Sequence, residues 1–511
     1  MSDPVLWAQA FLISNDAATK THGPWKARGY QAEMLRDRSL RKVYRCGRRC
    51  LPSWIKILDP ITGELKTVEE LYNRKTANVV AMDEKDYSIK TRESCPVSYN
   101  GKKEVYRVKL TDGRRIEATD NHPFYTPDGW KELKDIKTGE FVAVPAELDC
   151  WGNREMSDNE VKLLAYYIGT ENNRDTIFPR NSNEAQSKDL KEVINSFNCD
   201  LTVADDPFLE YHIKRKKIFV FNGAKRTLAK YGVYKCASKN KKIPREIFIL
   251  PKEQVALFLS RLYSIGGQIN LHYPMGRRQR DVEIEYWSSS KELIRGIAHL
   301  LLRFGIDYTI EREDDIWRLF IVKKKNIMTF LDNIGLYGED NKIRRCIKAL
   351  SYIVDKPEAR PPLSNKIIWK KVFSIKSIGM HNTYDLHVPE YHNFVANDII
   401  VHNTGKTEVM IIEGLWKAFT AREEEKRRIL YITPYENQVN LIFMRMREFI
   451  HDSPLLKNDI KRMINSPYVI EFSNGSMIMG FTTGASSGSG AASVRGQRAD
   501  DIFCDELDKT L

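Results

Sequence analysis

A phosphate-binding loop divided between two distant parts of the chain constrains the fold more than any other feature of the sequence. Gly405-Lys406-Thr407 has the residue types of the second half of a Walker A loop. The first half lies far upstream, as Cys46-Gly47-Arg48-Arg49, after a run (40–45) that we predict to be a short strand. When residues 50–403 are lifted out, the two halves form one continuous loop. The sequence therefore predicts an ATPase domain interrupted by a segment that removes itself.

The length, charge and cysteine content indicate an intracellular protein with several domains. A chain of 511 residues can bury several cores, and its formal net charge of +13 indicates an acidic partner such as nucleic acid. The eight cysteines include no Cys-x-x-Cys pair, which argues against a zinc site and fits a reducing compartment. The first residues lack the layout of a signal peptide, and no apolar run approaches the ~18 residues of a membrane span.

Two segments on either side of a central insertion have the pattern of an all-β domain. In residues 50–150, short alternating runs are separated by turn pairs such as Asn100-Gly101 and Asp112-Gly113. Residues 363–403 continue this pattern and contain the turn pair Asn397-Asp398. We therefore predict one β domain that residues 151–362 divide.

The insertion is predicted to be an α/β domain that contacts nucleic acid. Helical spacing occurs at 163–168 and 255–265, and most clearly at 293–303. Residues 214–245 hold twelve Lys or Arg and no Asp or Glu, so we favour phosphate contact over a merely solvated face. The candidate DNA-contacting residues are Lys214, Arg215, Lys216, Lys217, Lys241 and Lys242.

Residues 404–511 have the alternation of a sheet covered by helices. A helix is predicted at 407–419, a buried strand at 429–434 and a second helix at 439–450. Because β and α segments alternate, a parallel sheet is expected. A later apolar strand ends at Asp505-Glu506, which is the pattern of a Walker B motif.

These motifs contain the side chains that nucleotide hydrolysis needs. In such a loop, backbone N–H groups surround the phosphates at a helix N-terminus, Lys406 would contact the β and γ phosphates, and Thr407 would bind Mg²⁺. Asp505 would hold the water shell of the metal, and Glu506 would polarise the attacking water. The amide of Gln31 can bond an adenine edge, although a surface glutamine is an equal alternative. The candidate ATP-binding residues are Gln31, Cys46, Gly47, Arg48, Arg49, Gly405, Lys406, Thr407, Asp505 and Glu506.

Residues 1–49 and 404–511 together resemble the N-terminal ATPase domain of phage terminase large subunits, the motors that pump DNA into proheads. Besides the joined loop, the resemblance rests on Tyr30-Gln31, Asn474-Gly475-Ser476, Arg495-Gly496-Gln497-Arg498 and Asp505-Glu506. The first loop position is Cys46, where this family usually has glycine. Superfamily 2 helicases share Gly-Lys-Thr and Asp-Glu and are the competing assignment.

The terminase resemblance implies cofactors, partners and a location. ATP and Mg²⁺ would be the cofactors of the ATPase that forms when residues 1–49 and 404–511 are joined. Arg48 or Arg49 would contact phosphate oxygens, and Gln31 would contact the adenine. DNA, a portal and a small terminase would be partners, in the cytoplasm of a phage-infected or prophage-carrying cell. The coupling motif and nuclease of that family are missing from this sequence, so this chain by itself is not expected to package DNA.

Residues 50–403 resemble an intein of the hedgehog/intein fold. The marks are Cys50 at the start, Thr119-Asp120-Asn121-His122, the run from Tyr384 to Phe394, and Val401-His402-Asn403 before a hydroxyl residue. All of these marks occur in this order. The first of them directly follows the first half of the broken loop, and the last directly precedes its second half. The resemblance implies autocatalytic protein splicing without metal, nucleotide or external energy.

Each residue type fits a step of that chemistry. Cys50 would attack the Arg49 carbonyl while Thr119 holds the peptide and His122 protonates the departing nitrogen. Thr404, activated by Asp385, would then accept the N-terminal segment. Asn403 would cyclise with help from His402 and His392. The candidate catalytic residues are Cys50, Thr119, His122, Asp385, His392, His402, Asn403 and Thr404.

The insertion resembles LAGLIDADG homing endonucleases, in which two paired helices each end in a metal-binding carboxylate. The first helix would be 163–171, with Thr170 where the acid is expected and Glu171 one position late. The second would be 258–267, which contains Ser264 near its end and has Gly266 at the acid position. We therefore expect DNA binding without efficient cleavage, with active cleavage of the intein-less gene as the alternative.

The predicted architecture is multidomain: an all-β hedgehog/intein splicing domain with an inserted α/β LAGLIDADG-type domain, flanked by two parts of an α/β P-loop ATPase domain. A DNA-binding protein that does not splice is the remaining competitor. The expected segments are 1–49 (start of the ATPase), 50–150 and 363–403 (splicing domain), 151–362 (endonuclease-like domain) and 404–511 (ATPase from Walker A to Walker B).

Overall fold

The computed structural model describes the chain except for residues 1–2, 17–20, 25–28, 40–49, 171–182, 204–210, 216–222, 273–280, 354–361, 387, 389–390, 403–405, 434–435, 483–497 and 505–511. Two compact units are formed, one by residues 1–47 with 404–511 and the other by residues 48–403. Nowhere in the described ranges is there a helix with both the length and the apolar character that crossing a membrane requires.

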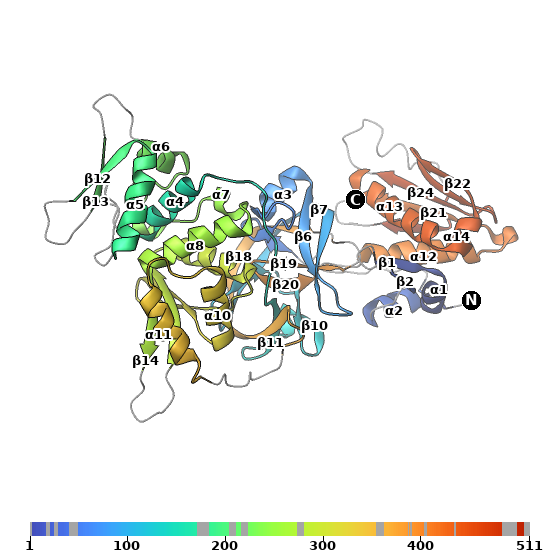
Figure 1. The fold of residues 1–511 in the computed structure, drawn as a ribbon. Helices are drawn as coiled ribbons and strands as arrows, with labels where there is room; N and C mark the ends of the chain where they lie inside the picture. The colour runs from blue at the N-terminus through green and yellow to red at the C-terminus, as the bar shows by residue number, and fades with distance from the viewer. Residues whose placement is uncertain are drawn as a thin grey trace. The chain divides into compact units, whose positions relative to one another are not determined.

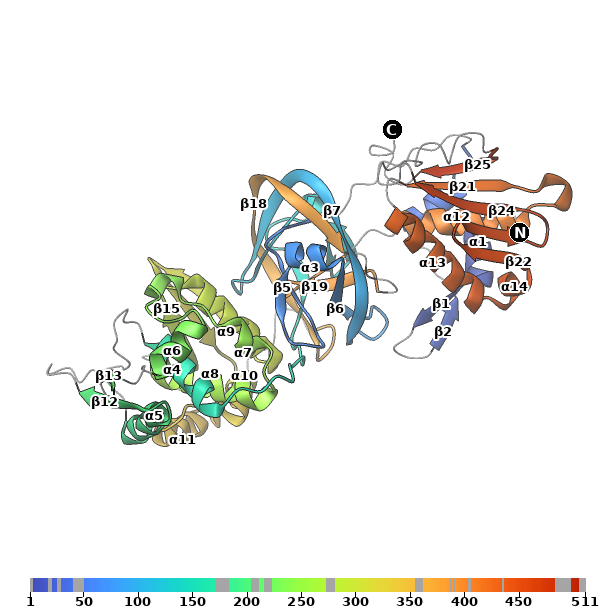
Figure 2. The ribbon, with the colours of Figure 1, turned by 90° about the horizontal axis from the view of Figure 1, so that it is seen from above.

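Two long antiparallel strands, β7 (Ile89–Leu110) and β18 (Ile367–Leu386), form the frame of the β domain in the second unit. One strand precedes the insertion and the other follows it, so both sequence segments build one domain. Three register shifts along the pair bend the strands, which Figure 2 shows as long curved ribbons. β11 (Phe141–Pro145) and β6 (Thr76–Met82) extend this sheet at its two sides.

The second sheet of the β domain has the strand order β10-β9-β20-β19 and again mixes both segments. Its strands are β9 (Pro123–Thr126), β10 (Gly129–Glu132), β19 (Asn393–Ala396) and β20 (Ile399–His402). Every residue of β19 and β20 is buried. The turn between them, Asn397-Asp398, has φ angles of 45° and 62°, which is the backbone that a two-residue hairpin loop requires.

A short helix corrects the prediction that residues 50–150 are purely β. α3 (Val68–Arg74) follows β5 (Leu65–Thr67), and Thr67 begins it with a capping box. The Glu70 N–H donates to Thr67 Oγ1 at 3.2 Å, and the Thr67 N–H donates to the Glu70 carboxylate at 2.7 Å. The remaining short elements are β3 (Leu51–Pro52), β4 (Lys56–Leu58), β8 (Arg115–Ala118) and the 3-10 turn η1 (Leu133–Asp135).

The inserted region mixes helices and strands, as expected, and its strands occur as antiparallel pairs between helices. Its helices are α4 (Asp158–Gly169), α5 (Glu184–Ser196), α6 (Gly223–Lys230), α7 (Arg245–Phe248), α8 (Lys252–Gly266), α9 (Lys291–Arg303), α10 (Lys324–Asn333) and α11 (Asp340–Leu350), with the 3-10 turn η2 (Ser238–Asn240). Its strands are β12 (Cys199–Val203), β13 (Tyr211–Arg215), β14 (Gly267–His272), β15 (Asp281–Ser288), β16 (Thr309–Glu313) and β17 (Ile316–Ile321). α4, α8 and α9 contain the three helices that the sequence predicts.

Close backbone contact joins the inserted region to the β domain. The turn after β7 reaches β16, where the Ile310 N–H donates to the Asp112 carbonyl at 2.9 Å. Gly113 has a φ of 87°, and a Cβ atom there would lie 2.6 Å from the Ile310 carbonyl oxygen. Only glycine fits this left-handed position against another backbone. Arg114 then donates to the Tyr308 hydroxyl at 3.2 Å, deep in the same contact.

A second tie joins helix α9 to the β19–β20 turn. Asp398 Oδ1 lies 2.8 Å from His299 Nδ1, and Arg303 Nε donates to His299 Nε2 at 3.1 Å. Burial lowers the pKa of His299, whereas His299 and Arg114 hold the pKa of Asp398 below its usual value although burial raises it. A neutral imidazole therefore donates through Nδ1 to a carboxylate and accepts through Nε2 from a guanidinium. The inserted region thereby holds the turn that carries the last strand of the β domain.

The first unit is built on a mixed sheet with the order β22-β23-β24-β21-β25. β21 (Arg428–Thr433) runs parallel to β24 (Met477–Thr482) and β25 (Asp501–Cys504), and it matches the predicted buried strand. β22 (Ile460–Asn465) and β23 (Tyr468–Phe472) pair antiparallel, which corrects the predicted parallel sheet. Short turns join β22, β23 and β24, and a parallel pair needs a longer crossover.

Helices cover this sheet, and Figure 1 shows α12, α13 and α14 beside its strands. α12 (Lys406–Thr420) and α13 (Glu436–Asp452) contain the two predicted helices. The other elements of the unit are α1 (Pro4–Phe11), α2 (Gly29–Arg36), α14 (Pro454–Asn458), the 3-10 turn η3 (Glu423–Glu425) and the hairpin β1 (Ile13–Asp16) with β2 (Thr21–Pro24).

Candidate active site

Cys50 lies in a buried cluster at the start of the second unit, and its side chain has no exposed surface (0%). Its N–H donates to Thr119 Oγ1 at 3.1 Å, and the Thr119 N–H donates back to the Cys50 carbonyl at 3.1 Å. Thr119 follows β8 directly, so the sheet fixes both partners. The amide nitrogen of the first predicted scissile bond is therefore held by a residue 69 positions away in the sequence.

Two polar side chains from β7 contact the Cys50 thiol. Asn100 Nδ2 lies 3.2 Å and Lys103 Nζ lies 3.5 Å from Cys50 Sγ. Burial and then the charge of Asp385 raise the pKa of Cys50, whereas the Lys103 ammonium and the Asn100 amide act in the opposite direction. The thiol is therefore protonated at rest, and the two β7 side chains stabilise the thiolate when it forms.

Neither Asn100 nor Lys103 is among the residues that the sequence predicts for this site. Asn100-Gly101 has the pattern of a turn pair, and Gly101 does have a positive φ of 75° within β7. No local pattern connects this position with Cys50, because the contact depends on how β7 and β18 curve together. The only available signal is the Asn-Gly pair itself, which marks a bend in a long strand.

Asp385 comes close to Cys50 because β18 pairs with β3. Thr383 pairs with Pro52 and Tyr384 pairs with Leu51, one residue after Cys50. Asp385 is next in this strand and pairs with Ser98 of β7. Its effect on the Cys50 pKa follows from this proximity. A carboxylate here disfavours the thiolate and is available to accept a proton from a hydroxyl group.

His122 is fully buried on a tight turn that also carries Thr119. The His122 N–H donates to the Thr119 carbonyl at 3.0 Å, and the Leu133 N–H donates to the His122 carbonyl at 3.0 Å. The imidazole also packs edge to face with the Phe124 ring, with ring centroids 6.1 Å apart. Thr119 and His122 are therefore held rigidly on one turn, with Thr119 bonded to Cys50.

His392 directly precedes the β19–β20 hairpin, and His402 is the last residue of β20. His392, which has a φ of 53°, and His402 have stacked rings with centroids 6.4 Å apart. The rings of Trp130 and His402 pack edge to face, with centroids 4.5 Å apart. Asn393 anchors the hairpin to β6, since its amide bonds both the N–H and the carbonyl of Met82, at 2.7 and 2.8 Å.

β20 also connects these histidines with the Thr119–His122 turn. Val401 pairs with Phe124 of β9, two residues after His122. The hairpin therefore ends beside the turn that holds Cys50. Two of the candidate catalytic residues, Asn403 and Thr404, lie outside the described residues.

Most candidate ATP-binding residues fall outside the described part of the chain. Gln31, Lys406 and Thr407 are described only as backbone, in α2 and at the start of α12. The candidates outside the described residues are Cys46, Gly47, Arg48, Arg49, Gly405, Asp505 and Glu506.

The Asn474-Gly475-Ser476 motif has a structural role in the first unit. Asn474 donates through Nδ2 to the carbonyls of Ala418 and Ala421, at 2.8 and 2.9 Å, and thereby caps the C-terminal end of α12. The Ser476 N–H donates to Asn474 Oδ1 at 2.9 Å. The Asn474-Gly475-Ser476 turn therefore fixes α12 against the β23–β24 hairpin.

The structure corrects one candidate DNA-contacting residue. Lys241 is buried (5% exposed), and its ammonium donates to the carbonyls of Tyr167, Ile168 and Thr170 at the end of α4. These bonds satisfy a helix C-terminus, so Lys241 is not available to a phosphate. Lys242 is exposed, Lys214 and Arg215 are described only as backbone in β13, and Lys216 and Lys217 lie outside the described residues.

The two candidate endonuclease helices, α4 and α8, pack against each other at their C-terminal ends. A Cβ atom on Gly169 would lie 3.2 Å from Ile265 Cβ. The Thr170 hydroxyl donates back to the Tyr167 carbonyl at 2.8 Å, and the Ser264 hydroxyl donates to the Ser260 carbonyl at 2.6 Å. A Cβ atom on Gly266 would lie 2.9 Å from the Tyr286 ring.

These helix ends present no carboxylate pair in the described residues, and Glu171 lies outside them. Across the described ranges, no group of three or more His, Cys, Asp or Glu side chains could hold a metal ion.

Comparison with known proteins gives one family. The family model of the intein splicing domain matches residues 60–403. Among curated proteins, the chain is similar to the replicative DNA helicase DnaB of Synechocystis sp., with 24% identity over 438 residues, 70% of this chain and 49% of the relative. The corresponding protein of Rhodothermus marinus is 22% identical over 437 residues, 70% of this chain and 46% of that protein. The chain thus spans about half the length of these curated relatives.

Solved structures include similar chains. A DnaB intein from Synechocystis sp. has 14% identity and a TM-score of 0.26, with 70% of this chain and 99% of that chain covered. The DnaX mini intein from Spirulina platensis has 10% identity and a TM-score of 0.24, with 69% of this chain and 99% of that chain covered.

Proposed function

Since this chain belongs to the family of intein splicing domains, we propose that residues 50–403 excise themselves and join Arg49 to Thr404. The observation that carries this proposal is the environment of Cys50. Its N–H donates a hydrogen bond to Thr119. The charge of Lys103 lowers the pKa of its thiol, and the charge of Asp385 raises it. The reaction breaks amide bonds and forms a new amide bond, so the residues of the chain can carry it out without an external source of energy.

The first step forms a thioester at Cys50. Its Sγ attacks the carbonyl carbon of Arg49, and the bond from that carbon to the Cys50 nitrogen breaks. Thr119 orients this nitrogen, and His122 gives it a proton. Asn100 and Lys103 stabilise the attacking thiolate, whose formation burial disfavours.

The second step moves the N-terminal segment to Thr404. The Thr404 hydroxyl attacks the thioester carbonyl, Asp385 accepts the hydroxyl proton, and Cys50 leaves as a thiolate. The Lys103 ammonium favours this leaving group, as it favours the attacking thiolate in the first step. Asp385 thus has the two properties that a base for a hydroxyl needs here: it lies close to Cys50, and it is a carboxylate.

The last steps release the intein. Asn403 Nδ2 attacks its own main-chain carbonyl carbon, a succinimide ring forms, and the bond to the Thr404 nitrogen breaks. His402 and His392 supply the acid and the base for this step, which their stacked rings at the end of β20 support. The freed Thr404 amine then attacks the Arg49 ester and forms the ordinary peptide bond.

The charge of Lys103 provides a direct test of this scheme. In an Asn403→Ala chain, which stops before release, we expect added dithiothreitol to cleave the N-terminal segment at Cys50. Lys103→Met removes the cation that lowers the Cys50 pKa, so the rate at neutral pH should fall roughly tenfold and the pH–rate curve should move to higher pH. The rates are measured by mass spectrometry between pH 6 and 9 at intervals of roughly half a unit.

Lys102→Met is the matched control, because Lys102 is the exposed neighbour of Lys103 on β7. Equal pH–rate curves for the two variants would remove Lys103 from the mechanism. For splicing itself, the wild-type chain should yield an excised segment 50–403 and a joined fragment of 1–49 with 404–511. An intact wild-type chain after folding would refute the proposal.

For the host segments we propose a terminase-type ATPase whose phosphate loop is restored by splicing. The start of α12 at Lys406, the strand β21 between two parallel neighbours and the Asn474 cap on α12 support a P-loop host. We further propose ATP and Mg²⁺ as its cofactors, with DNA, a portal and a small terminase as partners in the cytoplasm of a phage-infected or prophage-carrying cell. A helicase-like ATPase is the second candidate, because two relatives are DnaB helicases.

For the inserted region we propose a LAGLIDADG-like domain that binds DNA and does not cut it efficiently. The paired ends of α4 and α8 support the relationship. Thr170 and Gly266 supply no carboxylate, Tyr286 crowds Gly266, and the Lys241 ammonium lies at the end of α4. A fixed ammonium beside the expected metal position opposes a second cation there.

The cleavage test uses the chain with Cys50→Ala and Asn403→Ala, so that it remains intact. In magnesium, a plasmid that carries the uninterrupted host gene should be retarded in a gel and should stay circular, because the metal lacks its carboxylate pair. Linear plasmid that depends on magnesium and on this chain would show an active homing endonuclease. A plasmid without the host sequence is the control for contaminating nuclease.

A further inference from the structure

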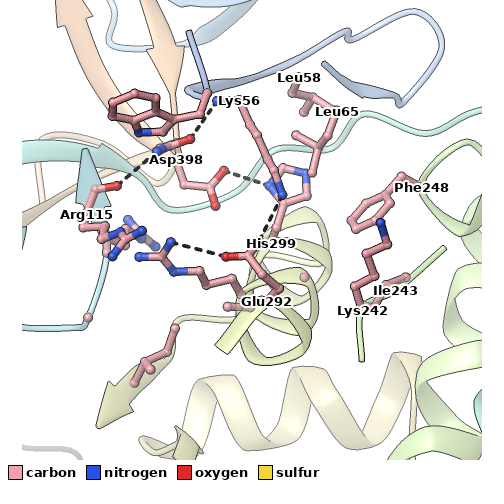
Figure 3. Close-up of a pocket in the computed structure, with 18 of the residues that line it drawn as sticks. Lys56, Leu58, Leu65, Arg115, Lys242, Ile243, Phe248, Glu292, His299 and Asp398 are labelled. Carbon is pink, nitrogen blue, oxygen red and sulfur yellow. Dashed lines mark hydrogen bonds and ion pairs between the residues drawn. The ribbon is translucent and has the colours of Figure 1, made fainter. Parts of the chain in front are cut away.

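A cavity of about 350 Å³ lies between the β domain and helix α9 of the inserted region. It is bounded by the β19–β20 turn and by residues from β4, β8 and α9. Figure 3 shows Arg115 and Glu292 on one side of this cavity, with Phe248 and Ile243 on the other. The cavity has no local signature in the sequence, because its lining residues come from segments far apart in the chain.

The polar side of the cavity has more cations than carboxylates to neutralise them. Glu117 is shared by Arg107 at 2.8 Å and Arg115 at 3.4 Å. In the same way, Glu292 is shared by Lys56 at 3.4 Å and Arg295 at 3.8 Å. Four cations therefore compete for two carboxylates in a partly buried place.

The pKa values of this side reflect the crowding. Burial and the Arg115 charge lower the pKa of Arg295 to about 10. Burial, Arg295 and Arg115 lower the pKa of Lys291, at the start of the same helix, to about 8. Both groups would gain from an added negative charge.

Two guanidinium groups on this side already face carboxylates. Arg114 Nε lies 3.5 Å from Asp112 Oδ2, and its Nη2 lies 3.9 Å from Asp307 Oδ1. Arg115 Nε lies 3.4 Å from Glu117 Oε1. The Arg114 side chain is only 1% exposed, so Arg115 and Arg295, which are 20% and 26% exposed, are the guanidinium groups that a ligand in the cavity can reach.

The opposite side of the cavity is apolar. Leu58, Leu65, Ile243, Phe248 and Val395 line it, and aliphatic and aromatic walls of this kind bind flat ring systems. Lys242 lies at this side and is exposed. The volume of the cavity fits a small ligand with one charged and one apolar end.

We propose that this cavity binds a small organic phosphate of the nucleoside monophosphate class, with its phosphate at Arg115 and Arg295 and its ring against Phe248. Arg side chains suit phosphate because their planar fork of donors matches its oxygens. Because Asn397 and Asp398 line the same cavity, a bound ligand would also touch the turn that leads into β20.

The experiment measures binding by isothermal titration to the full chain with Cys50→Ala and Asn403→Ala, which remains one species. Adenosine monophosphate should bind saturably, and both inorganic phosphate and adenosine should bind at least tenfold more weakly. Arg295→Gln should weaken binding of the monophosphate at least tenfold, and Lys242→Gln severalfold. Arg345→Gln, on the exposed face of α11, is the control and should leave binding unchanged.

Several outcomes would overturn the proposal. They are the absence of saturable binding, equal affinity for the monophosphate and for either adenosine or phosphate, and unchanged affinity in both cavity variants. Loss of binding in Lys406→Ala with none in Arg295→Gln would assign the ligand to the host loop instead. Lys242 is exposed, so its variant tests the cavity even if Arg295→Gln does not fold. Binding at this cavity does not depend on splicing, so its failure and that of the splicing proposal are distinct.

Discussion

A chain that carries both Cys50→Ala and Asn403→Ala is expected to stay intact, with no excised segment and no joined fragment. The first change removes the nucleophile that we propose for the Arg49–Cys50 bond, whose amide nitrogen Thr119 holds. The second removes the side-chain amide that we propose as the group that breaks the bond to Thr404. Neither bond then has a route to cleavage faster than uncatalysed amide hydrolysis.

The single variants separate the two halves of the reaction. Cys50→Ala should give no joined fragment but should still allow cleavage after Asn403, because the stacked His392 and His402 remain in place. Asn403→Ala should accumulate the thioester or the branched ester, which base or thiol treatment releases. Cys150→Ala, a change at a half-buried cysteine outside the cluster, is the matched control and should splice. Any joined fragment from the double variant, detected by mass spectrometry, would contradict the mechanism.

The joined host fragment is expected to bind ATP roughly a hundredfold more tightly than the intact double variant. Before splicing, residues 50–403 interrupt the covalent continuity of the loop, so we do not expect its backbone N–H groups to surround the phosphates together. Splicing adds several charge-assisted hydrogen bonds, each worth about 1.5–3 kcal/mol, of which roughly 3 kcal/mol net suffices for this change. The affinity is measured by titration with a fluorescent ATP analogue.

Lys406→Ala in the joined fragment is the control and should return the affinity to that of the unspliced chain. ATP hydrolysis that depends on Lys406 in the unspliced chain would show that the loop is complete without splicing. Equal ATP affinity before and after joining would remove the P-loop assignment of the host, and it would leave the splicing chemistry untouched.

The sequence predicts those parts of the site that depend on local chemistry. Thr119 and His122 lie in one short motif, and their joint turn follows from the contacts within it. The Asn397-Asp398 turn has the positive φ angles that this residue pair tolerates. The helices α4, α8 and α9 follow from spacing of apolar residues, which burial on one face enforces.

The parts that it does not predict arise from contacts between distant segments. Lys103 reaches Cys50 only because a long strand curves. Lys241 belongs to a basic run that predicts a solvated, DNA-facing surface. In the structure, its ammonium is buried because it donates hydrogen bonds to carbonyls at the end of α4. The antiparallel part of the host sheet follows from short turns, which alternation of helices and strands does not reveal.

The buried link from Arg303 through His299 to Asp398 bears on the inheritance of the inserted region. A gene that shed residues 151–362 in one event would remove both the imidazole and the guanidinium, and it would leave the Asp398 carboxylate, in a turn next to β20, with the charge of Arg114. The turn would lose the hydrogen bonds that fix it together with the helix that covers it. A shortened lineage is therefore expected to hold the turn before β20 by other contacts.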